Sequence, residues 1–195
     1  QSITQTGVSS PIQISSSSST WSYVAEGYES VYALKANGTL WHCGRGTEGQ
    51  NGNGTATNRS SPAQIGAAAN WVRVQAGHLF AAALNSSGQL YTWGHNDHGQ
   101  LGQNSTVNVT TPNLVLSNVS QNPDSFSCGM QWMAAIKTDG TLWTWGRGIN
   151  GQLGDATTIS KSSPVQTTYG GTNWRSVTCG DITTHALTYT EKGVQ

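Results

Sequence analysis

The chain repeats several landmarks about every fifty residues, and this period constrains its fold more than any other feature. Two serine or threonine residues followed by proline occur four times, at spacings of 51, 50 and 52 residues, and end at Pro11, Pro62, Pro112 and Pro164. A second landmark, W-x-x-V-x-x-G, begins at Trp21, Trp71 and Trp174, and a weaker copy ends at Gly129. Several landmarks in one order at one period indicate a chain built from stacked copies of a single small unit.

Each copy has the pattern of short β-strands rather than of helices. Polar and apolar residues alternate over residues 71–75 and 142–146, and turn sequences end at the glycines of a third landmark, Gly38, Gly88 and Gly140. Glycine loops follow, over residues 44–52, 94–102 and 146–154. We therefore expect about four short strands in each copy. Because one such sheet cannot bury both of its faces alone, the sheets must stack, which predicts an all-β propeller.

These landmarks resemble the repeats of the regulator of chromosome condensation family. The resemblance runs from W-x-x-V-x-x-G through G-x-L-W-x-W-G to G-Q-L-G and S-S-P, and it covers the chain from about Ser9 to Val194. It implies a β-propeller, which in this family normally has seven blades. The family includes a nuclear guanine-nucleotide exchange factor, plant photoreceptors, secreted β-lactamase inhibitor proteins and many repeats in bacteria and phages. The threonine- and asparagine-rich, lysine-poor repeats of this chain are most similar to the phage-type and secreted bacterial ones.

The resemblance implies a fold and a style of binding rather than a chemistry. Family members often have histidine three residues after the glycine of W-x-x-V-x-x-G, where this chain has Ser30, Phe80, Trp132 and Thr183. The chain also has no basic segment of the nuclear type. A nuclear exchange factor is therefore a distant third hypothesis.

The repeats form one propeller domain over residues 1–195. They fall near residues 9–60, 61–110, 111–162 and 163–195, and the last repeat stops after its first two strands. Residues 1–14 have the pattern of the third and fourth strands that this repeat lacks. We therefore expect a propeller of about four blades, with three complete repeats and one blade split between the two ends of the chain. Three arrangements remain open: the ring closes within one chain, it closes across chains, or the chain belongs to a longer protein.

The charge of the chain excludes two classes of partner. Lysine and arginine number 9, aspartate and glutamate also number 9, and charged residues make up only 9% of the chain. Binding to nucleic acid needs a basic excess that covers many phosphates, and a polybasic membrane anchor needs clustered lysine and arginine. No stretch approaches the roughly 20 apolar residues of a membrane span. We expect neither nucleic-acid binding nor membrane insertion.

No catalytic motif is present, since the sequence lacks a G-x-S-x-G elbow, an H-E-x-x-H motif and a P-loop. The carboxylates form no acid–base pair, so we expect no catalytic residue, no cofactor and no enzyme activity. His95 and His98 form a histidine cluster, but zinc requires more ligands than Asp97 adds. We interpret this segment as a solvated loop without a metal.

The three cysteines, Cys43, Cys128 and Cys179, have no metal-like spacing. We interpret them as buried or half-buried free thiols. A disulfide between Cys128 and Cys179 is the alternative.

Sequons are more frequent than chance predicts. Asn-x-Ser/Thr without proline occurs seven times, about twice the expected number, at Asn37, Asn53, Asn58, Asn85, Asn104, Asn108 and Asn118. Polar turns place serine and threonine beside asparagine and account for much of this excess. The other interpretation is N-glycosylation of an extracellular protein.

The glycine loops would lie together at one end of a propeller, where loops on a rigid scaffold commonly bind partners. Trp132 is added as an aromatic that could anchor a partner protein, although a core position is the stronger interpretation. The candidate binding residues are His95, Asn96, Asp97, His98, Arg147, Asn150 and Trp132.

We expect a non-enzymatic structural or adhesion module of a virion, such as a phage fibre, tail or capsid decoration, or of another extracellular assembly. The low charge, the small polar residues and the phage-type repeats favour this hypothesis. The partners would be other subunits of the assembly, further copies of the chain, and a cell-surface glycan or protein receptor. The alternative is a secreted protein- or glycan-binding propeller that inhibits or regulates a partner. Both hypotheses place the chain in a virion or outside the cell.

Overall fold

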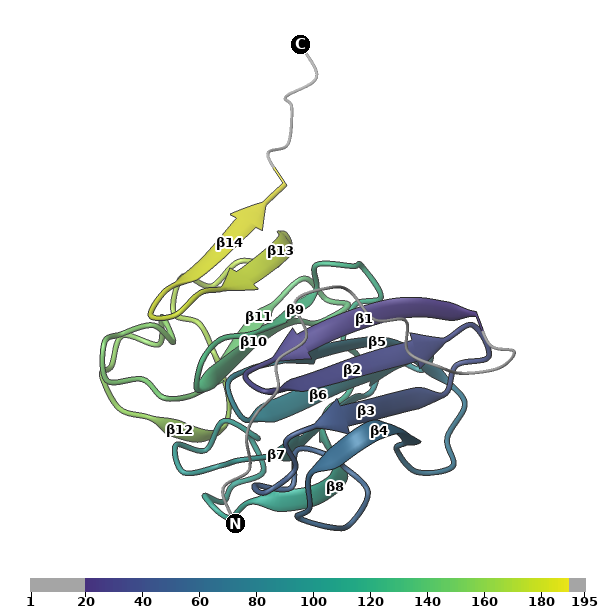
Figure 1. Cartoon of the computed structure of the whole chain (residues 1–195). Helices are drawn as coiled ribbons and strands as arrows, with labels where there is room; N and C mark the ends of the chain where they lie inside the picture. The colour runs from purple at the N-terminus through teal and green to yellow at the C-terminus, as the bar shows by residue number, and fades with distance from the viewer. Residues whose placement is uncertain (1–19, 190–195) are drawn as a thin grey trace, which may run out of the picture.

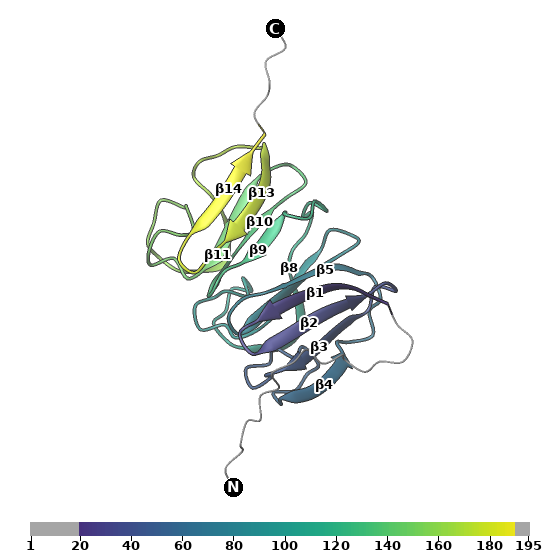
Figure 2. The same cartoon turned by 45° about the horizontal axis from the view of Figure 1, so that its top comes forward.

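The computed structural model describes residues 20–189, which form 14 β-strands in four antiparallel sheets. No helix occurs among these residues. The sheets stand side by side in an arc (Figure 1), with the first sheet at one end and the last sheet at the other (Figure 2). The prediction of an all-β propeller is confirmed.

Three of the sheets have four strands and are complete blades, and the fourth sheet has two strands. The first blade consists of β1 (Trp21–Gly27), β2 (Ser30–Lys35), β3 (Leu40–Gly44) and β4 (Arg59–Gln64). The second consists of β5 (Trp71–Ala76), β6 (Phe80–Asn85), β7 (Leu90–Gly94) and β8 (Val109–Leu116). The third consists of β9 (Phe126–Cys128), β10 (Trp132–Ile136), β11 (Leu142–Gly146) and β12 (Lys161–Gln166). The fourth sheet consists of β13 (Trp174–Cys179) and β14 (Thr184–Thr188).

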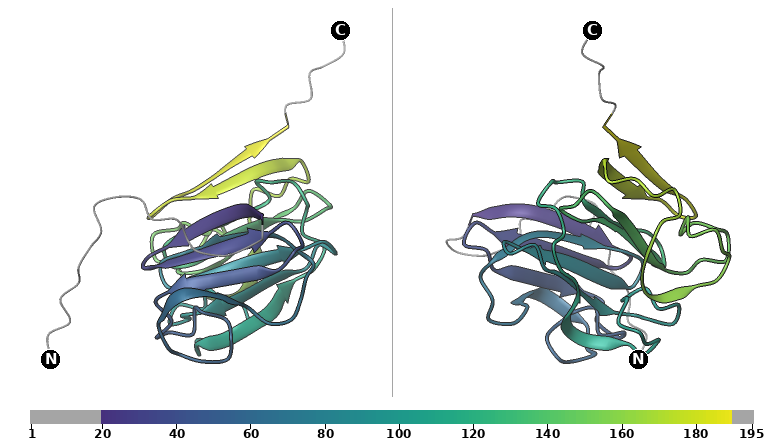
Figure 3. Two further views of the ribbon diagram at one scale, coloured as in Figure 1. Left: turned by 45° about the vertical axis from the view of Figure 1, so that its right-hand side comes forward. Right: turned by 180° about the vertical axis from the view of Figure 1, so that it is seen from behind.

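Within each sheet the strands follow one another in the order of the sequence. The first strands of neighbouring sheets, β1, β5, β9 and β13, contact one another in turn along the inner side of the arc. The view from behind (Figure 3, right) shows the purple first blade and the yellow fourth sheet on opposite sides of the two central blades. Residues 1–14, expected to complete the fourth blade, lie outside the described residues, so the split blade stays a prediction.

The sheets begin at the W-x-x-V-x-x-G landmark and end at the serine/threonine–proline landmark. Pro62, Pro112 and Pro164 lie in β4, β8 and β12, the last strand of each blade. Proline has no N–H to donate and is tolerated on such an edge strand. A period counted from one proline to the next therefore spans parts of two blades.

Each hydrophobic core lies between two neighbouring sheets. One core joins the first and second blades, and its buried residues include Leu40 and Val74. A second joins the second and third blades, with Leu101 and Met133, and a third joins the third blade to β13, with Val177. Ala81, Ala82 and Ala83 on β6 are fully buried, and such small side chains let the sheets approach closely.

A tryptophan side chain links each pair of neighbouring complete blades. The indole N–H of Trp93 donates to the carbonyl oxygen of Gln50 in the first blade at 2.9 Å. The indole N–H of Trp145 donates to the carbonyl oxygen of Gln100 in the second blade at 3.0 Å. These bonds explain two landmarks together, because the tryptophan that precedes the last glycine of L-Y-T-W-G or L-W-T-W-G donates to the backbone of the glutamine in the preceding G-Q-N-G or G-Q-L-G loop.

A second link between blades lies at the opposite end of the strands. The backbone N–H of Trp71 donates to the carbonyl of Gly38 at 3.1 Å, and the N–H of Trp174 donates to the carbonyl of Gly140 at 3.3 Å. Gly140 has a φ of +78°, and a Cβ there would collide with the backbone carbonyl of Thr172. The glycine of G-x-L-W thus permits the backbone that leads into the next sheet to approach closely.

Candidate functional site

The turns that join the first and second strands of the four sheets lie at the same end of the strands, on one face of the arc. They span residues 27–30, 77–80, 129–132 and 180–183. The residue after the repeat glycine in each turn faces a shared hollow of about 560 Å³, and we call these four residues, Tyr28, His78, Met130 and Asp181, the turn ring. A pocket shared by several repeats is a common place for a binding site.

Backbone hydrogen bonds join the turn ring from blade to blade. The N–H of Tyr28 donates to the carbonyl of His78 at 3.3 Å, and the N–H of His78 donates to the carbonyl of Met130 at 3.2 Å. The rings of Tyr28 and His78 stack with centroids 4.3 Å apart. The backbone therefore holds the same geometry in successive blades while the side chain differs.

The repeat glycines are required for this geometry. A Cβ on Gly129 would lie 2.6 Å from the indole of Trp132, and one on Gly77 would overlap the ring of Phe80. Phe80 and Trp132 are both buried and pack beside these glycines. In the second and third blades, the backbone of the turn is thus held by the glycine and by the buried aromatic residue three positions after it. The residue next to the glycine remains variable.

The glycine loops rise from the same end as the turn ring. The first loop residue of each complete blade donates its N–H to the adjacent turn, from Arg45 to the Glu29 carbonyl at 2.7 Å and from Arg147 to the Gln131 carbonyl at 2.9 Å. The Arg45 guanidinium also pairs with the Glu29 carboxylate at 2.9 Å. We call the four turns and the starts of these loops the turn face.

Glu29 has a φ of +109°, which is unusual for a residue other than glycine. Its backbone carbonyl and its carboxylate both bind Arg45, and these two contacts hold the conformation. Such backbone strain is found where a side chain must be presented in one direction.

Two of the predicted binding residues are part of the core. Asn96 is fully buried and holds its own loop, since its side-chain amide donates to the carbonyls of Ser105 and Val107 at 2.9 and 3.0 Å. Trp132 is 1% exposed, and its indole N–H donates to the Thr184 hydroxyl at 3.0 Å. Neither side chain offers a surface to a partner, so the suggested anchoring role of Trp132 is corrected to packing.

The other predicted residues, His95, Asp97, His98, Arg147 and Asn150, lie on the two glycine loops of the turn face. His95 and Asp97 face each other at 3.0 Å. Partial burial and the positive charge of Arg147 lower the pKa of His98, which keeps its imidazole neutral at pH 7. A role of these residues in binding stays a prediction.

The cysteines are free thiols, as expected, and no disulfide joins Cys128 to Cys179. Both of these residues line the hollow below the turn ring. Burial raises the pKa of the Cys179 thiol to about 11 and that of Cys128 well above its usual value. Both are therefore protonated at neutral pH, and a protonated thiol is neither a nucleophile nor a metal ligand.

Residues 20–189 contain no group of three or more histidine, cysteine, aspartate or glutamate side chains close enough to share a metal ion. The same part of the chain has no helix able to cross a bilayer.

Several sequon asparagines serve as turn residues. The side-chain oxygens of Asn37 and Asn53 accept from the N–H groups of Thr39 and Thr55, at 3.2 and 3.1 Å. Asn85 is 4% exposed and is therefore inaccessible to a glycosylating enzyme in the folded protein. These contacts give a structural reason for asparagine beside threonine, and glycosylation of the remaining sequons stays a prediction.

The four residues of the turn ring share no residue type and belong to no motif, so the sequence analysis did not indicate them. The signal that finds them is their position, directly after the repeat glycine.

Comparison with known proteins identifies the family of the chain. Residues 37–84, 87–136 and 139–187 each match the sequence profile of the Regulator of chromosome condensation (RCC1) repeat, and residues 71–100 match a second profile of this repeat. The chain belongs to the RCC1 repeat family.

Solved RCC1-type propellers have the same fold. Human WBSCR16 shares 24% sequence identity with a TM-score of 0.73, over 87% of this chain and 45% of that one. Yeast RCC1 (Prp20), solved bound to Kap60, shares 20% identity with a TM-score of 0.73, over 89% of this chain and 43% of that one. Among curated proteins, the X-linked retinitis pigmentosa GTPase regulator homolog of Caenorhabditis elegans is 34% identical over 70 residues, 35% of this chain and 5% of that protein. This RCC1 chain thus spans less than half the length of each of these relatives, and the similarity to phage-type repeats stays a prediction.

Proposed function

We propose that this RCC1 chain is a non-catalytic module that binds a protein partner on its turn face. The observation that carries the proposal is the turn ring, in which equivalent backbone positions present different side chains around one hollow. Repeat proteins commonly set their specificity in this way, with a constant scaffold and variable contact residues.

The side chains of the turn face have the composition of a protein interface. Tyr28, Met130 and Ile182 are 54%, 42% and 65% exposed, although they are large and apolar. The Glu29–Arg45 ion pair lies beside them at the rim. Aromatic residues and methionine are enriched at the centres of protein interfaces, with charged groups around them.

The descriptions of relatives also favour a protein partner. One is a GTPase regulator homolog, one was solved bound to Kap60, and the yeast protein Prp20p was characterised for its binding to Gsp1p and histones. These partners belong to those proteins. They support a protein-binding use of the fold by analogy, and they do not identify the partner of this chain.

The expected role in a virion or another extracellular assembly is one form of this proposal, in which the partner is a neighbouring subunit. A secreted inhibitor or regulator is the other form, in which the complex is reversible. Both require the same turn face.

Site-specific photocrosslinking in the source material tests the proposal. A photoreactive phenylalanine analogue replaces Tyr28 or Met130 in two variants, and replaces Leu114 in a control. Leu114 is 47% exposed on the outermost strand of the second blade, away from the turn face. We expect the two turn-face variants to crosslink the same protein and the control to crosslink none.

Equal crosslinking from position 114, or none from positions 28 and 130, contradicts the proposal. A crosslinked product that loses its added mass with glycosidase treatment identifies a glycan instead of a protein.

A further inference from the structure

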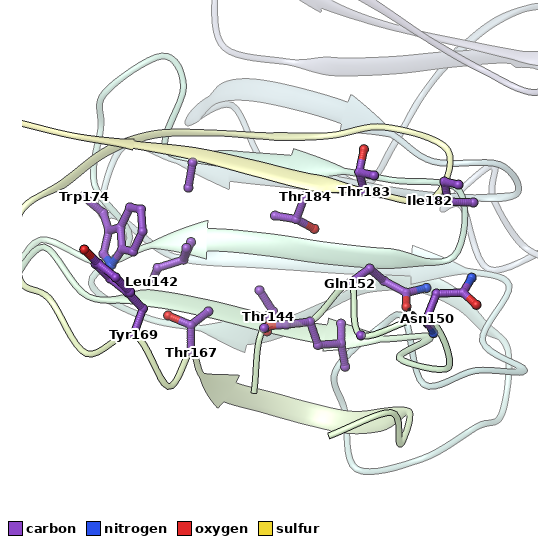
Figure 4. Close-up of a pocket in the computed structure, with 14 residues that line it drawn as sticks. Leu142, Thr144, Asn150, Gln152, Thr167, Tyr169, Trp174, Ile182, Thr183 and Thr184 are labelled. Atoms are coloured by element: carbon purple, nitrogen blue, oxygen red, sulfur yellow. Dashed lines mark hydrogen bonds between the residues drawn. The ribbon is translucent and has the colours of Figure 1, made fainter. Parts of the chain in front are cut away.

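A second hollow opens in the first blade, beside the turn face. It has a volume of about 500 Å³ and lies between the turn residue Glu29, the loop residues Arg45 and Thr47, and the start of β4 at Arg59 and Ser60. The hollow beside the fourth sheet, shown in Figure 4, is of similar size, about 400 Å³, but none of the described residues that line it is charged. We call the hollow in the first blade the arginine pocket, because two of its three charged residues are arginines.

The charge of Arg45 is already balanced. Its guanidinium lies 2.9 Å from the carboxylate of Glu29 and 3.9 Å from that of Glu48, and its Nε donates to the hydroxyl of Thr47 at 2.9 Å. Glu48 does not line the pocket, and its carboxylate also accepts from the side-chain amide of Asn108 at 2.9 Å. Arg45 therefore offers little to a ligand, and the cation that remains in the pocket is Arg59.

Arg59 forms no ion pair in the part of the chain that the structure describes. Its Nε is buried and donates to no atom of residues 20–189. Burial and, after it, the positive charge of Arg59 lower the pKa of the neighbouring His42. Because a buried donor on a charged group is costly without an acceptor, such groups normally have one. The wall of the pocket thus includes a charged donor whose acceptor is not among the described residues.

The other two complete blades show how this position is used elsewhere in the chain. The first residue of the fourth strand pairs with the last residue of the third strand in each blade, and these first residues are Arg59, Val109 and Lys161. In the third blade, Nζ of Lys161 lies 3.3 Å from the carboxylate of Asp155, whose side chain is 7% exposed. In the second blade, valine needs no counter-charge.

The position of Asp155 is equally well defined, as the residue that follows the last glycine of each loop. It is Asn53 in the first blade and Gln103 in the second. Asn53 and Asp155 form the same local turn, since Oδ1 of each accepts from the N–H two residues later, on Thr55 and Thr157, in both cases at 3.1 Å. The second blade thus lacks both charges and the third blade has both. The first blade keeps the cation and has an amide in place of the carboxylate.

We propose that the arginine pocket binds an aspartate or glutamate side chain of the partner protein, whose carboxylate accepts from the guanidinium of Arg59. This inference rests on the proposed function and names the chemistry of the partner residue that binds beside the turn face. A carboxylate matches the fork of N–H groups on arginine. The carboxylate of Glu29, which also lines the pocket, disfavours a group of higher negative charge such as a phosphate.

Other donors of the pocket suit the second oxygen of a carboxylate. Oδ1 of Asn58 accepts from the N–H of Gly46 at 3.0 Å, so its Nδ2 remains as a donor beside the hydroxyl of Ser60.

Nuclear magnetic resonance on the full chain tests the pocket without the partner. The probe is glutamate blocked at both ends, N-acetyl-glutamic acid α-amide, and the matched neutral probe is the corresponding glutamine compound. The Nε–H resonance of Arg59 reports binding. We expect the glutamate probe to shift this resonance with half-saturation below about 100 mM, and the glutamine probe to leave it unchanged.

Two variants of the chain give a matched control for this titration. Asn53→Asp places in the first blade the carboxylate that the third blade has, and it keeps the acceptor for Thr55. Asn104→Asp adds the same charge to the loop of the second blade, one residue beyond Gln103. We expect Asn53→Asp to bind the glutamate probe at least fivefold more weakly, because the new carboxylate competes for Arg59, and Asn104→Asp to bind it as the wild type does.

Photocrosslinking from position 28 tests the same pocket with the partner present. Arg59→Gln removes the cation, and the control Arg175→Gln removes an arginine at the other end of the strands, where it stacks on Tyr189 at 5.3 Å. We expect Arg59→Gln to lower the yield of crosslinked partner at least fivefold and Arg175→Gln to leave it unchanged.

The inference is overturned if the two probes shift the Arg59 resonance equally or not at all. It is also overturned if Asn53→Asp binds the glutamate probe as Asn104→Asp does, or if Arg59→Gln crosslinks as well as Arg175→Gln. A failure of the proposed function gives a different result, since position 28 of the otherwise unaltered chain then crosslinks no protein. In that case the titration of Arg59 alone decides whether the pocket binds a carboxylate.

Discussion

Acid should destabilise this propeller through one buried histidine, His42 of β3. Its side chain is 2% exposed and its ring lies against that of Tyr32, with centroids 4.9 Å apart. Neither ring nitrogen has a hydrogen-bond partner among the described residues. Burial, together with the positive charge of Arg59, lowers the pKa of His42 to about 4 from an ordinary value of 6.5.

The sign of the effect follows from this direction. Because the folded protein binds the proton less readily than the unfolded chain, His42 leaves stability unaffected above about pH 6.5 and reduces it as the pH falls toward 4. With a pKa of about 4 when folded and about 6.5 when unfolded, protonation favours the unfolded chain by about 2.5 kcal/mol at pH 4.5.

His42→Thr isolates this effect, because the other blades already have threonine at this position. Thr92 and Thr144 donate to the carbonyls of Leu101 and Leu153 at 2.7 and 2.6 Å. The variant keeps every other titratable group, so the pH dependence that it loses belongs to His42.

The assay is urea denaturation followed by circular dichroism, at pH 7 and pH 4.5, for the wild-type chain and for His42→Thr. The free energy of unfolding of the wild type should fall by about 2.5 kcal/mol more than that of the variant between the two values of pH. If the two proteins lose the same stability within about 0.5 kcal/mol, the argument that His42 is buried and neutral is refuted.

Three further results are expected. Trp145→Phe removes the indole donor to the buried Gln100 carbonyl and should lower the free energy of unfolding by about 2 kcal/mol, measured in urea; an unchanged midpoint would contradict the blade-to-blade link. Gly140→Ala should destabilise the chain by more than about 2 kcal/mol, because its Cβ collides with backbone, whereas Gly151→Ala, with a similar φ and open space, should cost about 1 kcal/mol. Equal melting temperatures for these two variants would refute the role of close approach. The Cys179 thiol, with a pKa of about 11, should alkylate about 100-fold more slowly at pH 7 than in urea, and comparable rates, followed by mass spectrometry, would show that it is not buried.

The architecture was predictable because the landmarks are the contacts between blades. The tryptophans and the glycines of the G-Q-L-G loops recur because each pair meets across an interface, as Trp145 and Gly102 do. Strand positions followed from the same landmarks. Closure of the ring could not be derived, because it depends on the angle between sheets, and no motif records that angle.

The candidate site was less predictable, for a physical reason. Tyr28, Met130 and Asp181 occupy one backbone position but share no chemistry, so a search for repeated residue types passes over them. Trp132 was weighed as an anchor because it differs from its counterparts in two other repeats. It is buried because Gly129 beside it leaves the space that its indole fills.

The links between blades have a consequence for how this molecule unfolds. Every link described joins a sheet to its neighbour in sequence, so cooperativity passes along the arc as in a one-dimensional chain of coupled units. The second blade has neighbours on both sides, whereas β13 and β14 have one, the third blade, among the described residues. Local unfolding should therefore begin at the two-stranded sheet and reach the second blade last. A substitution that unfolds the second blade would divide the arc into two units that fold independently of each other.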